Sequence, residues 1–190
     1  SDLGAQNAVD MAVEEINAGD SGYKIEIVNG GKVADDAKDA KQAMNAYNKV
    51  MADSPEAIVG SFFSSVTLPM AEQASKDGML LLATGATNAD VTLKGDSIFR
   101  NCFIDPYQGK IMAEFAAKDL KLKKIAILND SSSDYSKGLA EVFEKTFTEN
   151  GGQIVAKEAF LSKDVDFKAA LTKLKAANPD ALYIPGYYEE

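Results

Sequence analysis

Hydrophobic residues along the chain follow two spacings, one typical of helices and one typical of strands. Apolar residues recur at helical spacing over residues 3–17, 35–51, 66–77, 107–119, 135–149 and 167–177. Short runs with strand character lie between them, at residues 23–28, 57–59, 79–83, 98–101, 124–128, 154–159 and 181–184. Strands separated by helices of this length predict right-handed crossovers and mostly parallel sheets, so the expected fold class is α/β.

Two of the predicted strands differ in pattern. The segment Tyr23–Val28 alternates apolar and charged residues, as a half-exposed strand does, and Asn29-Gly30-Gly31 ends it as a turn. The segment Met79–Ala83 is apolar throughout, which predicts a parallel strand covered on both faces. The pattern allows one open sheet or two smaller sheets with a break near residues 100–106.

Composition narrows the classes of partner. The 190 residues are 46% hydrophobic, which is typical of a packed globular protein. The formal net charge is −9, and this argues against binding to nucleic acid or to anionic lipid, since both require a basic face. No run approaches the roughly 20 apolar residues of a membrane-spanning helix.

The residue types that are missing also exclude most catalytic sites. The chain has no histidine, so Ser-His-Asp and Cys-His systems are excluded. Its one cysteine, Cys102, is expected to be buried and inert. The Gly30-Gly31-Lys32 stretch is no P-loop, and no dinucleotide fingerprint is present. We therefore expect a protein that is not an enzyme and that uses no cofactor and no metal. The alternative is a Ca²⁺ site made of carboxylates alone, for which the sequence has no EF-hand spacing.

Ligands of open α/β sheets lie beyond the carboxyl ends of the strands, so the residues after each strand are the candidates for binding. Ser64 and Ser65 follow the strand that ends at Gly60 and precede a helix. Their hydroxyls, with the free N–H groups of a helix start, suit a carboxylate. The alternative is that one serine only caps the helix, and the two interpretations are compatible if the other serine binds.

Three further strands end in candidate residues. Small residues around Gly85 let a ligand approach the backbone, and the Thr87 hydroxyl can both donate and accept a hydrogen bond. Tyr135 and Tyr187 follow later strands, where a ring and a hydroxyl suit the wall of a pocket. The alternatives are an ordinary turn at residues 84–88 and tyrosines that only pack within the fold.

These same stretches resemble the leucine/isoleucine/valine-binding protein family in order and spacing over essentially the whole chain. The stretches are Ile58-Val59-Gly60, Ser64-Ser65 with Thr67 and Pro69, Gly85-Ala86-Thr87-Asn88, Phe99-Arg100, Asp134-Tyr135 with Gly138, and Gly186-Tyr187. The resemblance implies a type I periplasmic-binding fold, in which two Rossmann-like lobes with helix-flanked parallel sheets close on a ligand.

The resemblance also assigns roles to residues. Ser64 and Thr87 would hold the carboxylate of an amino acid, with Ser65 beside them. The Gly85 carbonyl and Thr87 would receive its ammonium group, and Tyr135 and Tyr187 would close over it from the second lobe. Residues 1–101 would form the N-terminal lobe, without the first strand of the family, and residues 102–190 part of the C-terminal lobe.

By the same resemblance, the chain would be part of an extracytoplasmic bacterial receptor that passes a branched-chain or other aliphatic amino acid to an ABC transporter permease. It would work on the periplasmic or outer face of the membrane, free or lipid-anchored, and the complete protein would be a monomer. The alternatives are a sensory ligand-binding domain of a membrane receptor and a receptor for an amide or urea-type solute.

Overall fold

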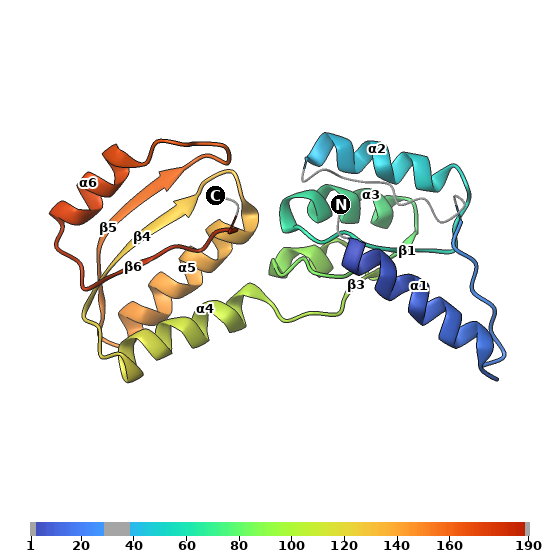
Figure 1. Cartoon of the computed structure of the whole chain (residues 1–190), viewed down its shortest axis with the longest axis horizontal. Helices are drawn as coiled ribbons and strands as arrows, with labels where there is room; N and C mark the ends of the chain where they lie inside the picture. The colour runs from blue at the N-terminus through green and yellow to red at the C-terminus, as the bar shows by residue number, and fades with distance from the viewer. Residues whose placement is uncertain (1–2, 29–38, 189–190) are drawn as a thin grey trace.

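The computed structural model describes residues 3–28 and 39–188. Its strands form two separate parallel sheets, which decides between the one-sheet and two-sheet hypotheses (Figure 1). The α/β class predicted from the sequence is confirmed. The turn predicted at Asn29-Gly30-Gly31 and the start of the helix predicted over residues 35–51 lie outside the described residues.

The first sheet is covered by helices on one face. Its strands β1 (Ala57–Val59), β2 (Leu80–Ala83) and β3 (Ile98–Arg100) lie in that order. Helices α2 (Ala40–Met51) and α3 (Ser64–Lys76) pack on one face around a core that includes Tyr47, Ile58, Val66, Leu81 and Ile98. On the other face Val59, Leu80 and Phe99 are exposed. The prediction that residues 79–83 are covered on both faces is therefore wrong for the described part of the chain.

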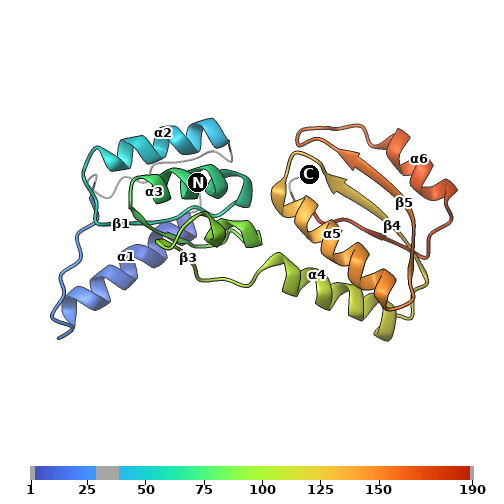
Figure 2. The ribbon, with the colours of Figure 1, turned by 180° about the vertical axis from the view of Figure 1, so that it is seen from behind.

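The predicted strand at Tyr23–Val28 is also wrong. A strand needs a neighbour that satisfies its backbone groups, and no described strand pairs with this segment. Its Ile25 instead exchanges two hydrogen bonds with the Asn17 side chain, each of 2.8 Å. Asn17 belongs to α1 (Leu3–Ala18), which lies on the side of β1 away from α2 (Figures 1 and 2) but leaves Leu80 and Phe99 exposed.

The second sheet has helices on both faces. Strand β4 (Lys124–Asp130) is central, between β5 (Gln153–Phe160) and β6 (Ala181–Tyr183). Helix α4 (Asp105–Glu114), its π-helical continuation Phe115–Asp119 and α5 (Asp134–Glu149) pack on one face, and α6 (Lys168–Ala176) packs on the other. Residues 125–128 of β4 are all buried as a result. Figure 2 shows α4 and α5 side by side.

The two sheets meet at a small junction. After the 3-10 helix Ala89–Lys94 and β3, the chain crosses at residues 101–104 to α4 (Figure 1). The N-terminal ends of α3 and α5 meet there, because Ser65 Oγ accepts a hydrogen bond from Asp134 N at 3.0 Å. The lobe boundary at residue 101 stays a prediction. None of the described helices has the length and hydropathy needed to cross a bilayer.

Candidate functional site

The start of α3 brings two serines to the junction. Ser64 is its first residue and is 1% exposed, and its Oγ accepts a hydrogen bond of 3.1 Å from Asn88 N. Ser65 Oγ accepts from Asp134 N of the second sheet's layer. Neither side chain caps α3, whose N-cap position is Phe63 without a side-chain hydrogen bond. The capping interpretation is therefore wrong, and both hydroxyls keep their own protons to donate.

A side chain of β3, that of Arg100, fixes the loop that follows β2. The Arg100 guanidinium donates to the carbonyls of Ala86, Asn88 and Ala89, at 3.2, 2.6 and 3.0 Å. It also donates to Thr92 Oγ1 at 2.8 Å. This clamp explains why a short loop without secondary structure keeps Thr87 at a fixed place, with 8% of its surface exposed.

Gly85 lies under an aromatic ring. A Cβ at this position would fall 2.4 Å from Cδ2 of Phe62, so only glycine lets the ring lie here. Phe62 in turn packs edge-on against Phe63, with ring centroids 5.3 Å apart. The small residue predicted to admit a ligand is thus covered by the Phe62 ring in this structure.

Two tyrosines from the second sheet's layer form one stack. Tyr135, in the first turn of α5, and Tyr187, after β6, stack with centroids 5.0 Å apart and planes 17° apart. Phe63 of the first layer meets Tyr187 edge-on at 5.1 Å. Aromatic pairs favour both geometries, so these rings form a continuous wall that runs between the two layers.

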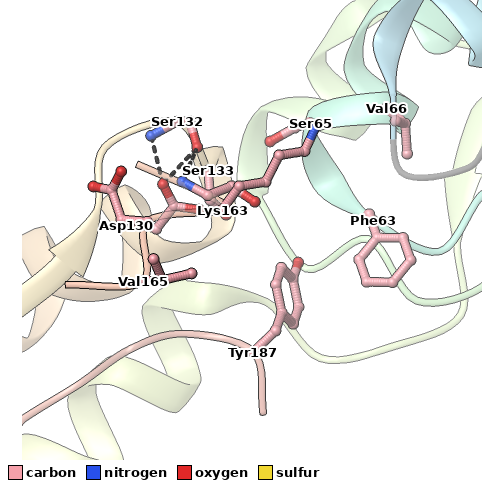
Figure 3. A pocket seen from close by; sticks show the side chains of 11 residues that line it. Phe63, Ser65, Val66, Asp130, Ser132, Ser133, Lys163, Val165 and Tyr187 are labelled. Carbon is pink, nitrogen blue, oxygen red and sulfur yellow. Dashed lines mark hydrogen bonds between the residues drawn. The ribbon is translucent and has the colours of Figure 1, made fainter. Parts of the chain in front are cut away.

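A cavity of about 350 Å³ opens beside this wall (Figure 3). The first layer contributes Phe63, Ser65 and Val66, and the second contributes Asp130, Ser132, Ser133, Ser162, Lys163, Asp164, Val165 and Tyr187. This size is in the range of small-molecule sites, and the lining mixes apolar walls with a few polar groups, as such sites do. The cavity is therefore the candidate site of the protein.

The predicted residues are brought together only in part. Ser65 and Tyr187 line the cavity, and Tyr135 stacks on Tyr187. Ser64, Gly85 and Thr87 do not line it, and the first and last of these are buried.

Sequence reasoning did not single out the cavity-lining residues that lie between the end of β4 and Tyr135, or those that follow β5. Asp130 is 1% exposed, and its Oδ1 accepts from Ser132 N at 2.8 Å and from Ser132 Oγ at 2.5 Å. Ser132 Oγ accepts in turn from Ser162 N at 3.2 Å, which fixes the loop that carries Lys163. Ser133 caps α5 by accepting from Ser136 N. The signal that could have found these residues is their position after strand ends, where ligands of α/β sheets lie.

Titratable groups at the junction respond to burial. Burial raises the pKa of Asp105, and the Thr87 side chain and the Arg100 charge offset part of that rise. Burial also raises the pKa of the Cys102 thiol, which disfavours its reactive thiolate form. Cys102 is only partly buried, so the prediction of a buried cysteine is wrong. Among the described residues, no cluster of carboxylates and thiols is arranged to hold a metal ion.

The chain is similar to known proteins over nearly its whole length. A profile of the family described as "periplasmic binding protein" matches residues 1–187. Leu/Ile/Val-binding protein homolog 3 of Brucella melitensis is 34% identical over 188 residues, which cover 97% of this chain and 50% of the relative. The chain thus spans about half the length of the curated relatives it matches.

Two solved structures share the fold. A leucine-binding protein from Thermotoga maritima has a TM-score of 0.86 at 35% identity, over 94% of this chain and 50% of that one. A branched-chain amino acid transporter substrate-binding protein from Streptococcus pneumoniae was solved in complex with isoleucine. It has a TM-score of 0.82 at 36% identity, over 96% of this chain and 51% of that one. These likenesses confirm the type I periplasmic-binding fold, of which the chain covers about half.

The comparisons also confirm the resemblance noted in the sequence. The matched family consists of solute-binding proteins and not of enzymes, in line with the missing nucleophile systems. The chain belongs to the periplasmic binding protein family and is similar over nearly its whole length to the family's Leu/Ile/Val-binding members.

Proposed function

We propose that the chain forms the ligand cleft of an extracytoplasmic receptor that captures a branched-chain or other aliphatic amino acid for an ABC importer. One observation carries this proposal: the serine-bearing start of α3 faces the Tyr135–Tyr187 stack across the junction. A zwitterion needs fixed polar groups at one end, and an aliphatic side chain needs apolar walls at the other. The names of the similar proteins supply the amino acid class.

The proposed roles follow from the hydrogen-bond donors and acceptors of the site residues that contacts within the protein leave unused. Ser64 and Ser65 each accept a backbone N–H and keep a proton for the ligand carboxylate. The positive N-terminal ends of α3 and α5 favour the same negative charge. Gly85 and Thr87 do not line the cavity, so the Gly85 carbonyl and Thr87 Oγ1 would accept from the ammonium group only after the Phe62 ring moves away from Gly85.

The proposed partner is the membrane permease of an ABC transporter, which would recognise the closed form. Ligand binding stabilises the closed arrangement only if the ligand contacts both layers, as a molecule between Ser65 and Tyr187 does. The whole protein would act as a monomer on the periplasmic or outer face of the membrane, free or lipid-anchored. Residues 1–101 would belong to its N-terminal lobe, and residues 102–190 would form part of its C-terminal lobe.

A thermal-shift panel of the twenty amino acids and small amides tests this function. A ligand at a hundredfold excess over its Kd stabilises the native state by about 2.7 kcal/mol. We expect shifts for aliphatic amino acids alone, lost in Thr87→Ala and kept in Thr146→Ala, a matched variant at a buried threonine of α5. Shifts for amides alone would favour the amide receptor, and a cooperative melt without any shift would reject both.

A further inference from the structure

Asp105, at the junction, carries a buried carboxyl group without a hydrogen-bond partner. It is the first residue of α4 and is 2% exposed. Among the described residues, its Oδ1 and Oδ2 are the buried side-chain atoms that lack a hydrogen-bond partner. An unsatisfied buried carboxyl group costs folding free energy, so its presence calls for an explanation.

The carboxyl group of Asp105 lies where three elements meet. Its backbone N–H donates to Thr87 O at 2.9 Å, which ties α4 to the loop after β2. A Cβ on Gly138 of α5 would lie 3.3 Å from Asp105 Oδ2 and 3.5 Å from Asn88 Nδ2, so glycine keeps this space open. The charged and titratable groups that interact with Asp105 are Arg100, Cys102 and Tyr183.

The nearby cation does not neutralise Asp105 by direct pairing. The Arg100 guanidinium donates to three carbonyls and one hydroxyl of residues 86–92. The Thr87 side chain, in contrast, lowers the pKa of the Asp105 carboxyl group and so offsets part of the rise caused by burial. The Thr87 carbonyl accepts from the Asp105 backbone N–H at 2.9 Å and Thr87 is itself buried, so its hydroxyl is a donor beside the two unsatisfied oxygens.

We propose that Asp105 is a positioning residue that accepts a hydrogen bond from the Thr87 hydroxyl and so turns the lone pairs of Thr87 Oγ1 toward the ligand ammonium. A hydroxyl has one proton and two lone pairs. If Thr87 Oγ1 accepts from an ammonium group, its proton must point to another acceptor, and Asp105 supplies one. This inference rests on the proposed function and adds to it a residue that the ligand does not touch.

A double-mutant cycle tests the coupling. Isoleucine binding is measured by calorimetry for the wild type, Asp105→Ala, Thr87→Val and the double variant. Each single change is expected to weaken Kd by about tenfold, since a hydrogen bond to a charged group is lost. In the Thr87→Val background, Asp105→Ala is expected to change Kd by less than about twofold. An equal loss in both backgrounds would overturn the proposal.

Three controls separate this role from a structural one. Thr146→Val replaces a buried threonine away from the junction, and its effect should add independently to that of Asp105→Ala. Asp105→Asn keeps an acceptor oxygen and should restore part of the affinity. Thermal midpoints of all variants show whether each is folded.

A measurement without ligand keeps the proposal separate from the proposed function. The carboxyl pKa of Asp105 is followed by ¹³C NMR in the wild type and in Thr87→Val. Loss of the hydroxyl donor should raise this pKa, and an unchanged pKa would overturn the proposal. If the wild type binds no amino acid, the proposed function fails while this titration still decides whether Thr87 donates to Asp105.

Discussion

Ser65 Oγ accepts a hydrogen bond of 3.0 Å from the backbone N–H of Asp134. This bond joins the N-terminal ends of two helices, α3 and α5, which pack on different sheets. The first N–H groups of a helix have no partner inside the helix, so this bond satisfies one that the fold would otherwise leave open. Asn88 Nδ2 donates to Asp134 O at 3.2 Å beside it. The two layers are thus held together by polar contacts at the candidate site.

Ser65→Ala should loosen this junction. The change leaves Asp134 N–H without its partner, and we expect a loss of about 1 kcal/mol in the free energy of unfolding. The radius of gyration from small-angle scattering should rise at the same time. Ser131→Ala is the matched control, because it removes a hydrogen bond of 3.0 Å to Phe160 O within the second layer. Equal radii for the two variants would contradict this role of Ser65.

Two glycines should respond differently to an added methyl group. At Gly152, a Cβ would fall 2.2 Å from the Phe147 ring, which is fully buried and has no room to move. Gly152→Ala should therefore cost about 1–3 kcal/mol in urea unfolding, as overpacked cores do. At Gly85, the ring in the way is Phe62, which is 47% exposed. Gly85→Ala should cost less stability, and a larger loss than for Gly152→Ala would contradict this ranking.

The buried carboxyl of Asp105 should make stability fall with rising pH. Burial raises its pKa in the folded state above the ordinary value of 3.8. The folded protein therefore holds this proton after the unfolded chain has lost it, and stability decreases as pH rises from about 3.8 through the folded-state pKa. The Asp105→Asn variant has no titratable carboxyl group at this position, so it should not show this part of the pH dependence.

The measurement is the free energy of unfolding of Asp105→Asn relative to wild type, taken at a series of pH values. Between pH 3.8 and the folded-state pKa of Asp105, the stability of the variant relative to wild type should increase as pH rises. Above that range the difference between the two proteins should stay constant. A difference that moves toward the wild type as pH rises would mean that the folded-state pKa of Asp105 is lowered.

Most of the fold followed from local pattern, and the errors have a common cause. Strands β1 and β2 were predicted near their observed bounds because apolar runs between helical segments mark them clearly. The error at Tyr23–Val28 arose because alternation predicts a strand only where a neighbour is available, and pairing is not a local property. The exposed face of β2 has the same origin, since an apolar run does not say how many layers cover it.

The candidate site was predicted by position but not by side-chain direction. The rule that ligands lie after strand ends placed Ser64 and Ser65 at the junction. It did not tell which of two adjacent serines faces the cavity, because this depends on how the first turn of α3 is rotated. Asp105 was missed because its environment comes from the loop after β2 and from α5, which are distant in sequence.

The central claim is that the cleft recognises both charged ends of an amino acid. The most direct measurement is a calorimetric titration of the chain with leucine, 4-methylpentanoate, which lacks the ammonium group, and isopentylamine, which lacks the carboxylate. We predict that leucine binds and that each analogue binds weaker by about a hundredfold or more, because the groups that served its missing end stay unpaired. Equal binding of leucine and either analogue would contradict the claim.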